Sequence, residues 1–215
     1  MAEIKNRRPL STRQTGWAAA LTKRLAATSV TPNQISMASM VAAAVAGCAF
    51  LASGHADGWA RAVLLLAAAL FCQLRLLCNL FDGMVAIEAG KSASDGAFWN
   101  EFPDRVADIF IFVGAGLGAF HPALGWAAAA FAVMTAYVRE HGRACGAPAD
   151  YCGPMAKQHR MAVMTLAAII AIFEGLWSGL GDALTVALWI VAIGSAITAI
   201  RRAARLVLRL RAVVR

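Results

Sequence analysis

The sequence reads NLFDGMVAIEAGKSASDGAFWNEFPDRVAD over residues 79–108, between two long apolar segments. This stretch holds six of the chain's twelve acidic residues, namely Asp82, Glu88, Asp95, Glu101, Asp104 and Asp108. Asn79 and Asp82 are three positions apart and share one face of a helix. The same geometry places Glu101, Asp104 and Asp108 on one stripe of the next helix. Two acidic stripes at a membrane edge offer the oxygen ligands that Mg²⁺ prefers, and they predict a divalent-metal site. The alternative is a solvated, charged connector between two membrane helices.

The composition indicates a membrane protein. Of the 215 residues, 60% are hydrophobic and 15% are charged, and the mean hydropathy is +0.63. Soluble domains are roughly 45–50% apolar. We therefore expect an all-α, polytopic membrane protein with six transmembrane helices. The apolar segments lie near residues 34–54, 60–87, 104–120, 122–140, 160–177 and 183–200.

The amino-terminal residues 1–30 are basic. Between Thr12 and Thr28, apolar residues recur at helical spacing against basic ones, which predicts an amphipathic helix lying in the membrane interface. The motif TPNQIS follows at residues 31–36, with Pro32 at the expected helix start and Asn33 as the expected cap. We divide the chain into this basic amino terminus and one transmembrane domain over residues 31–215.

Pro103 lies at the start of the third apolar segment and bears on where its helix begins. Proline is tolerated in the first turn of a helix but not in its interior. We therefore expect this helix to begin near Asn100, with Asp104 in its first turns and Asp108 one turn deeper. Ionisable residues at such depth are functional candidates. Further along the same segment, Gly114, Gly116 and Gly118 favour close helix packing.

Lysine and arginine residues alternate between the connectors. They are abundant before residue 30, in the 139–160 connector and after residue 200, whereas the intervening connectors contain Arg61 alone. The positive-inside rule then places both termini and the acidic stretch in the cytoplasm, in what we expect to be a bacterial cytoplasmic membrane. The net charge of +8 is read as a topology signal and an anionic-lipid contact, not as a nucleic-acid footprint.

The acidic stretch resembles the signature of the CDP-alcohol phosphotransferases, DxxDGxxAR followed by GxxxDxxxD. Asp82, Gly83, Ala86, Asp104 and Asp108 stand at matching positions. The TPN element and the six-helix layout resemble the family as well. The chain departs from the signature in that Asn79 replaces the first aspartate and Ile87 replaces the arginine. The second glycine of the signature also fits poorly. Counting forward from Ile87 leads to Gly96, whereas counting back four residues from Asp104 leads to Asn100.

The resemblance implies a metal-dependent enzyme of phospholipid synthesis. A CDP-alcohol, most often CDP-diacylglycerol, donates its phosphoalcohol group to the hydroxyl of a small alcohol, and CMP is released. Mg²⁺ or Mn²⁺ is expected on Asp82 and Asp104, with Asn79 and Asp108 around it. Asp108 is the expected general base, and Glu101 is a possible replacement for the charge missing at Asn79. Gly83 and Ala86 lack bulk, so the cytidine can lie against them. Relatives commonly form homodimers.

A second polar region, residues 137–160, carries basic side chains at the ends of two helices. Arg139, Arg143, Lys157 and Arg160 are candidates for binding a phosphorylated acceptor or the donor's diphosphate. The alternative is ordinary positive-inside flanking charge.

Two other classes of protein remain open. A small transporter would also have intramembrane carboxylates, but more often at the membrane midplane. A non-catalytic lipid- or nucleotide-binding relative is the other alternative, and Asn79 and Ile87 motivate it. Release of CMP from a CDP-alcohol separates an enzyme from both.

Overall fold

The structure is a computed structural model that describes residues 16–88, 90, 95–176 and 181–213. These residues form helices and contain no strand, which confirms the expected all-α class. The elements are α1 (Gly16–Ala26), α2 (Pro32–Ser53), α3 (Gly58–Glu88), α4 (Gly96–Gly118), α5 (Pro122–Ala144), α6 (Lys157–Ala171), the short 3₁₀ helix η3 (Glu174–Leu176) and α7 (Asp182–Val213).

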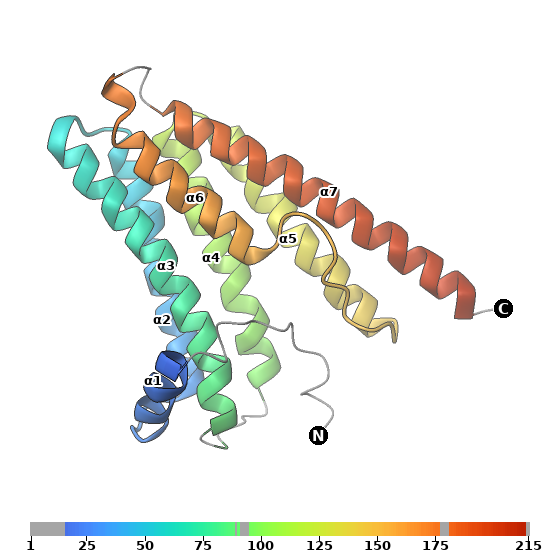
Figure 1. Cartoon of the computed structure of the whole chain (residues 1–215). Helices are drawn as coiled ribbons and strands as arrows, with labels where there is room; N and C mark the ends of the chain where they lie inside the picture. The colour runs from blue at the N-terminus through green and yellow to red at the C-terminus, as the bar shows by residue number, and fades with distance from the viewer. Residues whose placement is uncertain (1–15, 89, 91–94, 177–180, 214–215) are drawn as a thin grey trace.

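The long helices form one bundle (Figure 1). Helix α2 packs against α3 and α4, α5 packs against α4 and α7, and α6 contacts both α3 and α7. The short helix α1 packs against α3. Figure 1 shows α1 near the carboxyl-terminal end of α3 and the amino-terminal end of α4, so the acidic stretch lies at this end of the bundle.

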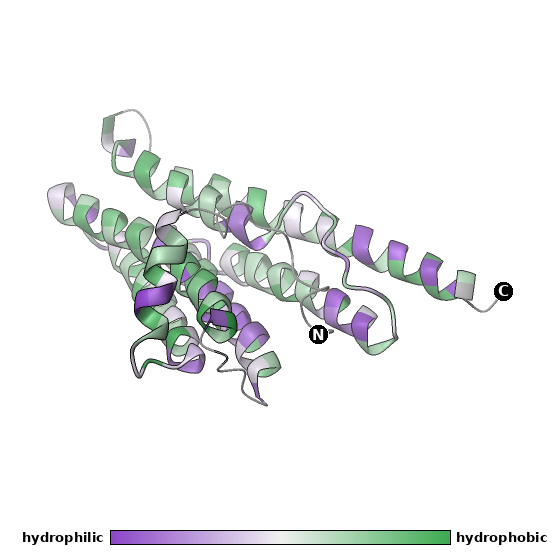
Figure 2. Ribbon diagram, turned by 60° about the horizontal axis from the view of Figure 1, so that its bottom comes forward, coloured by the Kyte–Doolittle hydropathy of each residue, from purple (hydrophilic) through white to green (hydrophobic). Residues whose placement is uncertain are grey.

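Three of the described helices are long and apolar enough to cross a membrane, Pro32–Ser53, Gly58–Glu88 and the Asp182–Ala212 part of α7. Helices α4 and α5 have 23 residues each, and α6 has 15. About 20 apolar residues span a hydrocarbon core. Hydrophobic residues cover most of the bundle, whereas hydrophilic residues recur along the carboxyl-terminal half of α7 (Figure 2).

The cap of α2 differs from the expectation. The N-cap is Thr31, whose hydroxyl accepts a hydrogen bond from the backbone N–H of Gln34, and Gln34 completes a capping box. Pro32 follows as the first helical residue, as expected. Asn33 is already inside the helix, so its assignment as the cap is wrong. Its side-chain amide instead donates to both carboxylate oxygens of Asp95.

Helix α4 begins four residues before the expected start at Asn100. Its N-cap is Asp95, and Pro103 lies inside the helix. Asp95 accepts hydrogen bonds from Asn33 on α2 and from the Trp99 indole at 2.8 Å. These contacts stabilise a turn before the proline, which explains why Pro103 does not define the helix start. Hydrogen bonds from Trp99 and Asn33 also lower the pKa of the Asp95 carboxyl from its ordinary value.

The last apolar segments also have different ends. Helix α6 stops at Ala171 and is followed by η3. Helix α7 continues to Val213, well beyond the expected end near residue 200. Arginine and leucine, which are frequent in this tail, are good helix formers. Arg202 also anchors the extension, because its guanidinium donates to the carbonyl of Thr135 on α5 at 2.7 Å and to that of Cys152 at 2.9 Å.

Glycines bring α2 and α4 into backbone contact. A Cβ atom at Gly47 would lie 2.3 Å from the Phe110 carbonyl oxygen, and one at Gly114 would lie 2.2 Å from the Gly47 carbonyl oxygen. Similarly, Gly118 faces the carbonyl oxygen of Phe50, and Gly116 faces Gly125 of α5. The expected close packing around Gly114, Gly116 and Gly118 is therefore confirmed.

A buried ion pair joins the elements at the opposite end of the bundle. A guanidinium nitrogen of Arg61 lies 2.7 Å from a carboxylate oxygen of Glu174, and the exposed fractions of the two side chains are 6% and 1%. The Arg61 guanidinium also donates to the Ser53 carbonyl at 3.0 Å. Glu174 further accepts from the backbone N–H groups of Gly181 and Ala183. These contacts fix the start of α7 against the end of α2 and the start of α3.

The contact between Gly114 and Gly47 gives a direct test of the packing. The substitution Gly114→Ala places a Cβ atom against backbone that cannot rotate away, and overpacking of this kind costs about 1–3 kcal/mol. We expect a lower thermal unfolding temperature for the variant in detergent. Gly96→Ala in the same helix is the control, because nothing lies within 4 Å of the added Cβ. Equal melting of Gly114→Ala and Gly96→Ala would contradict the proposed close contact.

Candidate active site

The three aspartates of the acidic stripes lie inside the bundle. Asp82 and Asp104 are each 4% exposed, and Asp108 is 0% exposed. Asp82 lies on α3, and the other two lie one turn apart on α4. A buried carboxylate is costly unless it is paired or hydrogen-bonded, so the partners of each group define what the site can do.

Arg75 on α3 is the central partner. One of its terminal guanidinium nitrogens lies 3.1 Å from Asp104 Oδ1 and 3.4 Å from Asp108 Oδ1. It also donates to the backbone carbonyl of Asp104 at 3.3 Å. The Arg75 side chain is fully buried. Its other terminal nitrogen and its Nε have no hydrogen-bond partner among the described residues. Arg75 thus joins both α4 aspartates to α3.

Helix α6 brings two further cations to the same acids. Lys157 Nζ donates to Asp104 Oδ2 at 2.6 Å and also to Asn79 Oδ1. An Arg160 terminal nitrogen donates to Asp108 Oδ2 at 2.8 Å. The side-chain amide of Asn79 in turn donates to Asp104 Oδ1 at 3.0 Å. The start of α6 is therefore attached to α3 and α4 through charged side chains.

Asp82 has a different environment. Its carboxylate accepts a hydrogen bond from the Ser36 hydroxyl of α2 at 2.7 Å and one from the Gly83 backbone N–H. Both of these donors are neutral, whereas Asp104 and Asp108 face guanidinium and ammonium groups. Asp82 is thus the aspartate whose charge is least compensated by the cations of the site.

The oxygen atoms of these residues are of the chemical kind that binds a hard cation. The carboxylates of Asp82 and Asp104 and the carbonyl of Asn79 supply oxygen ligands of the kind that bind Mg²⁺ or Mn²⁺. The Asn79 carbonyl and Asp104 Oδ2 already converge on a cation, the Lys157 ammonium group. Within the described part of the chain, no group of three or more His, Cys, Asp or Glu side chains is placed to hold a metal ion.

The four basic residues expected to bind phosphate fall into two sets. Lys157 and Arg160 lie in the aspartate cluster. Arg139 instead pairs with Glu101 of α4 and, at 2.8 Å, with Glu140. Arg143 pairs with Glu140 at 2.9 Å, and its side chain is 47% exposed. Arg139 also lies over the Tyr151 ring, 5.6 Å from its centroid.

Glu101, the candidate for the missing charge, belongs to the set of Arg139 and not to that of Asn79. Arg105 lies between the two sets, 3.7 Å from a Glu101 oxygen and 3.5 Å from Asp104 Oδ2. Gly83 is buried next to Asp82, and Ala86 is half-buried one turn further along α3. Ile87 is exposed, so a side chain at this position points away from the cluster.

Sequence reasoning did not assign a role to Arg75, Arg105 or Ser36. Arg75 was detectable in principle, because it is an isolated charge in an apolar helix and precedes Asn79 by one turn. Ser36 had no such signal, since its role depends on the packing of α2 against α3. Lys157 was assigned to a phosphate, and its contact with Asn79 and Asp104 arises from the tertiary fold.

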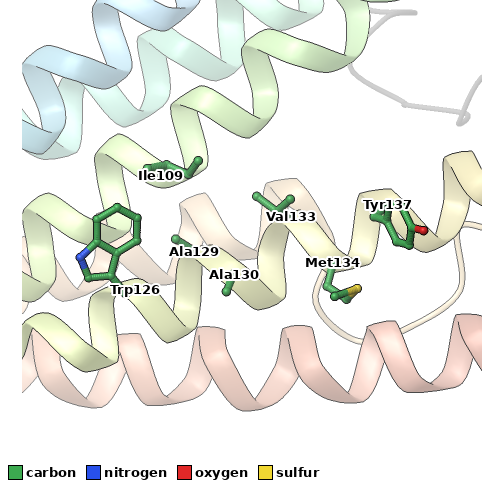
Figure 3. Close-up of a pocket in the computed structure, with 7 residues that line it drawn as sticks. All are labelled: Ile109, Trp126, Ala129, Ala130, Val133, Met134 and Tyr137. Atoms are coloured by element: carbon green, nitrogen blue, oxygen red, sulfur yellow. The ribbon is translucent and has the colours of Figure 1, made fainter.

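An apolar groove lies between α4 and α5. It has a volume of about 460 Å³ and is lined by Ile109 of α4 and by Trp126, Ala129, Ala130, Val133, Met134 and Tyr137 of α5. Figure 3 shows Trp126 and Tyr137 at opposite ends of the row of α5 residues. The groove contains none of the aspartates, so it is a surface for apolar groups rather than a second charged site.

Curated proteins with similar sequences have one name in common. The chain is 32% identical over 140 residues to a phosphatidylinositol phosphate synthase of Streptomyces avermitilis, covering 60% of this chain and 56% of that protein. It is 28% identical over 182 residues to a phosphatidylinositol phosphate synthase of Mycobacteroides abscessus, covering 80% of this chain and 75% of that protein. The chain thus spans little more than half the length of the first relative. No protein-family model matches the sequence.

Solved structures with a similar fold include the phosphatidylinositol phosphate synthase of Mycobacterium tuberculosis. Its complex with manganese and citrate superposes with a TM-score of 0.72 at 21% identity, covering 88% of each chain. Its structure with CDP-DAG bound gives a TM-score of 0.71, covering 88% of this chain and 92% of that one. At this level of identity the likeness establishes the fold.

The buried ion pairs of Asp108 with Arg75 and Arg160 should contribute strongly to the stability of the fold. Asp108→Asn removes the negative charge between two buried guanidinium groups, and breaking a buried pair in this way costs about 3–5 kcal/mol. Asp150→Asn is the control. Asp150 lies 3.2 Å from Arg205 and 3.3 Å from Arg209, and the side chains of these arginines are 51% and 37% exposed. The Asp150 side chain is 13% exposed, and loss of pairs whose cations are open to solvent costs about 0–1 kcal/mol. We expect a large loss of thermal stability for Asp108→Asn alone. Similar losses for both variants would contradict a stabilising role for the buried Asp108 ion pairs.

Proposed function

We propose that this chain, which belongs to the CDP-alcohol phosphotransferase family, transfers a phosphatidyl group from CDP-diacylglycerol to the hydroxyl of an alcohol and releases CMP. The observation that carries the proposal is the set of buried carboxylates on α3 and α4, of which the two on α4 contact cations from α3 and α6. A CDP-alcohol has a diphosphate and a leaving nucleotide, and both need this combination of acid residues and positive charge.

We assign Asp82, Asp104 and Asn79 to holding a divalent ion, Mg²⁺ or Mn²⁺, with Asp108 next to it. When bound, the ion neutralises the diphosphate and stabilises the departing CMP. Gly83 and Ala86 leave space for the cytidine along α3. Support for this assignment comes from the oxygen-rich donor set and from the manganese complex of the M. tuberculosis protein.

Asp108 is the proposed general base for the acceptor hydroxyl. Its Oδ2 is held by Arg160 at 2.8 Å, whereas its Oδ1 lies 3.4 Å from Arg75. Oδ1 has the longer and weaker contact, so it is the atom we expect to accept the proton. The hydroxyl oxygen then bonds to the lipid-side phosphorus, and the bond between that phosphorus and the CMP oxygen breaks.

The relatives' name favours a phosphorylated inositol as the acceptor. Lys157 and Arg160 contact the aspartates, so Arg139 and Arg143 remain as the residues that we assign to an acceptor phosphate. Glu101 then acts through its ion pair with Arg139 rather than as a substitute for the missing aspartate. A donor whose acyl chains lie in the bilayer explains why the proposed cytoplasm-facing site is built between membrane helices.

We further propose six membrane-spanning helices, α2 to α7, in a bacterial cytoplasmic membrane, with α1 in the interface and residues 1–30 as a separate basic segment. The alternating basic connectors support cytoplasmic termini and a cytoplasmic active site. The arrangement of α1 beside the acidic end of the bundle is consistent with it. We also propose a homodimer, for which the apolar surface around Trp126 and Met134 offers a candidate contact.

The activity has a direct test. Purified protein in lipid nanodiscs should release CMP from CDP-diacylglycerol when Mg²⁺ or Mn²⁺ and a suitable alcohol are both present, and EDTA should stop the release. Asp82→Asn should weaken donor binding that depends on the divalent ion. Asp108→Asn, studied where it remains folded, should retain donor binding and lose about 10²–10⁴-fold in turnover.

Asp182→Asn serves as the control, because Asp182 is an exposed acid at the start of α7. It should leave both binding and turnover unchanged. Donor binding without CMP release across a broad acceptor panel would identify a non-catalytic lipid-binding protein instead. Movement of a solute across the membrane without CMP release would favour a transporter.

The orientation is tested by labelling cysteines from each side. Cys145 is exposed in the connector after α5, and we expect a membrane-impermeant thiol reagent to reach it from the cytoplasmic side. Asp57 is exposed between α2 and α3. In a chain whose native cysteines are replaced by serine, Asp57→Cys should react only from the outside. Reaction of both positions from the same side would rule out the proposed topology.

A further inference from the structure

We infer that the Lys157 ammonium group is a built-in cation on the oxygen atoms of Asn79 and Asp104, so that this chain binds one divalent ion and excludes a second. The inference rests on the proposed function and deepens it. It concerns the contacts of Asn79, Asp104 and Lys157, where the chain departs from the DxxDG pattern.

The Lys157 ammonium group lies where oxygen ligands from two helices meet. Its nitrogen contacts the carbonyl oxygen of Asn79 on α3 and Asp104 Oδ2 on α4 at 2.6 Å. The Lys157 side chain is 20% exposed and the Asp104 side chain is 6% exposed. A lysine that served only as flanking charge would extend toward solvent and lipid headgroups. Here it points into the bundle and bridges α3 and α4.

Asn79 is matched to this lysine by its hydrogen bonds. Its carbonyl oxygen accepts from Lys157, and its amide donates to Asp104 Oδ1 at 3.0 Å. An aspartate at position 79 would have no donor to offer Asp104. Two carboxylates would then face each other at this distance, and they would need an additional positive charge between them. With asparagine in place, one ammonium group satisfies both side chains.

The charges near Asp104 leave little need for a further cation at the same point. Arg75 contacts Asp104 at 3.1 Å, and Arg105 approaches it at 3.5 Å. Asp82, by contrast, is held by the neutral donors Ser36 and Gly83. The single divalent ion that we assign to Asp82, Asp104 and Asn79 would therefore be attracted mainly by Asp82, and the Lys157 ammonium group would repel a second ion at Asn79 and Asp104.

The first test measures Mn²⁺ binding by electron paramagnetic resonance, without nucleotide or acceptor. The unmodified chain should bind one Mn²⁺. Lys157→Met removes the repelling charge and should tighten Mn²⁺ binding on the order of tenfold, because a like charge at the same site opposes binding of a cation. Lys23→Met, which removes an exposed lysine on α1, is the matched control and should leave the affinity unchanged.

The second test counts the bound ions. Asn79→Asp alone should still bind one Mn²⁺, because Lys157 pairs with the new carboxylate. Asn79→Asp combined with Lys157→Met should bind two. Asn79→Asp keeps every cation of the cluster, so it provides a result even where loss of Lys157 prevents folding. Three results would each overturn the inference. The first is two bound ions in the unmodified chain or in Asn79→Asp, and the second is unchanged or weaker Mn²⁺ binding in a folded Lys157→Met chain. The third is one bound ion in a folded double variant.

The CMP-release assay separates this inference from the proposed function. A chain that releases CMP but binds two Mn²⁺ is an enzyme of the proposed class without a built-in cation. A chain that binds one Mn²⁺, with tighter binding in Lys157→Met, but releases no CMP retains the inferred cation and lacks the proposed activity. A chain that binds no Mn²⁺ contradicts the inference whatever its activity.

Discussion

The buried contact of Arg75 with Asp104 and Asp108 is the interaction on which the polar interior depends. A fully buried guanidinium group is tolerated only with compensating negative charge, and α4 supplies this from two successive turns. The two carboxylates carry more negative charge than Arg75 alone can neutralise, and they also pair with Lys157 and Arg160 from the start of α6. One electrostatic network thus joins three helices that are distant in the sequence, at the end of the bundle where we place the chemistry.

Backbone packing and the site are coupled through α2. The contacts at Gly47 and Gly114 hold α2 against α4 at a distance that no side chain would permit, while α2 also packs along α3. Ser36 on α2 therefore reaches Asp82 on α3 at 2.7 Å. The serine hydroxyl gives Asp82 a defined orientation without neutralising its charge. A helix that contributes no acid or base thus determines which aspartate remains available to a cation.

Local rules predicted the parts of this structure that local forces determine. Helical spacing placed Asp104 and Asp108 on one stripe of a helix, as the structure has them on α4, and the glycines of α4 indicated its close packing. The predicted start of α4 at Asn100 was wrong because the side chains of Trp99 and of Asn33, which lies on another helix, stabilise a cap at Asp95. The extension of α7 was missed because Arg202 is anchored on α5 and on the following loop. Lys157 and Ser36 could not be placed by spacing, since their contacts cross from α6 and α2 to partners far away in the sequence.

The two departures from the family pattern have different physical consequences. Ile87 is 59% exposed at the end of α3, so the arginine expected there is replaced by a side chain that makes no contribution to the buried charges. Asn79 lies inside the network, and both ends of its amide are used, one toward Lys157 and the other toward Asp104. A carboxylate at that position would add a fourth buried negative charge beside Asp82, Asp104 and Asp108. Asparagine removes this charge while keeping an oxygen atom in the network, so less positive charge is needed to balance the site.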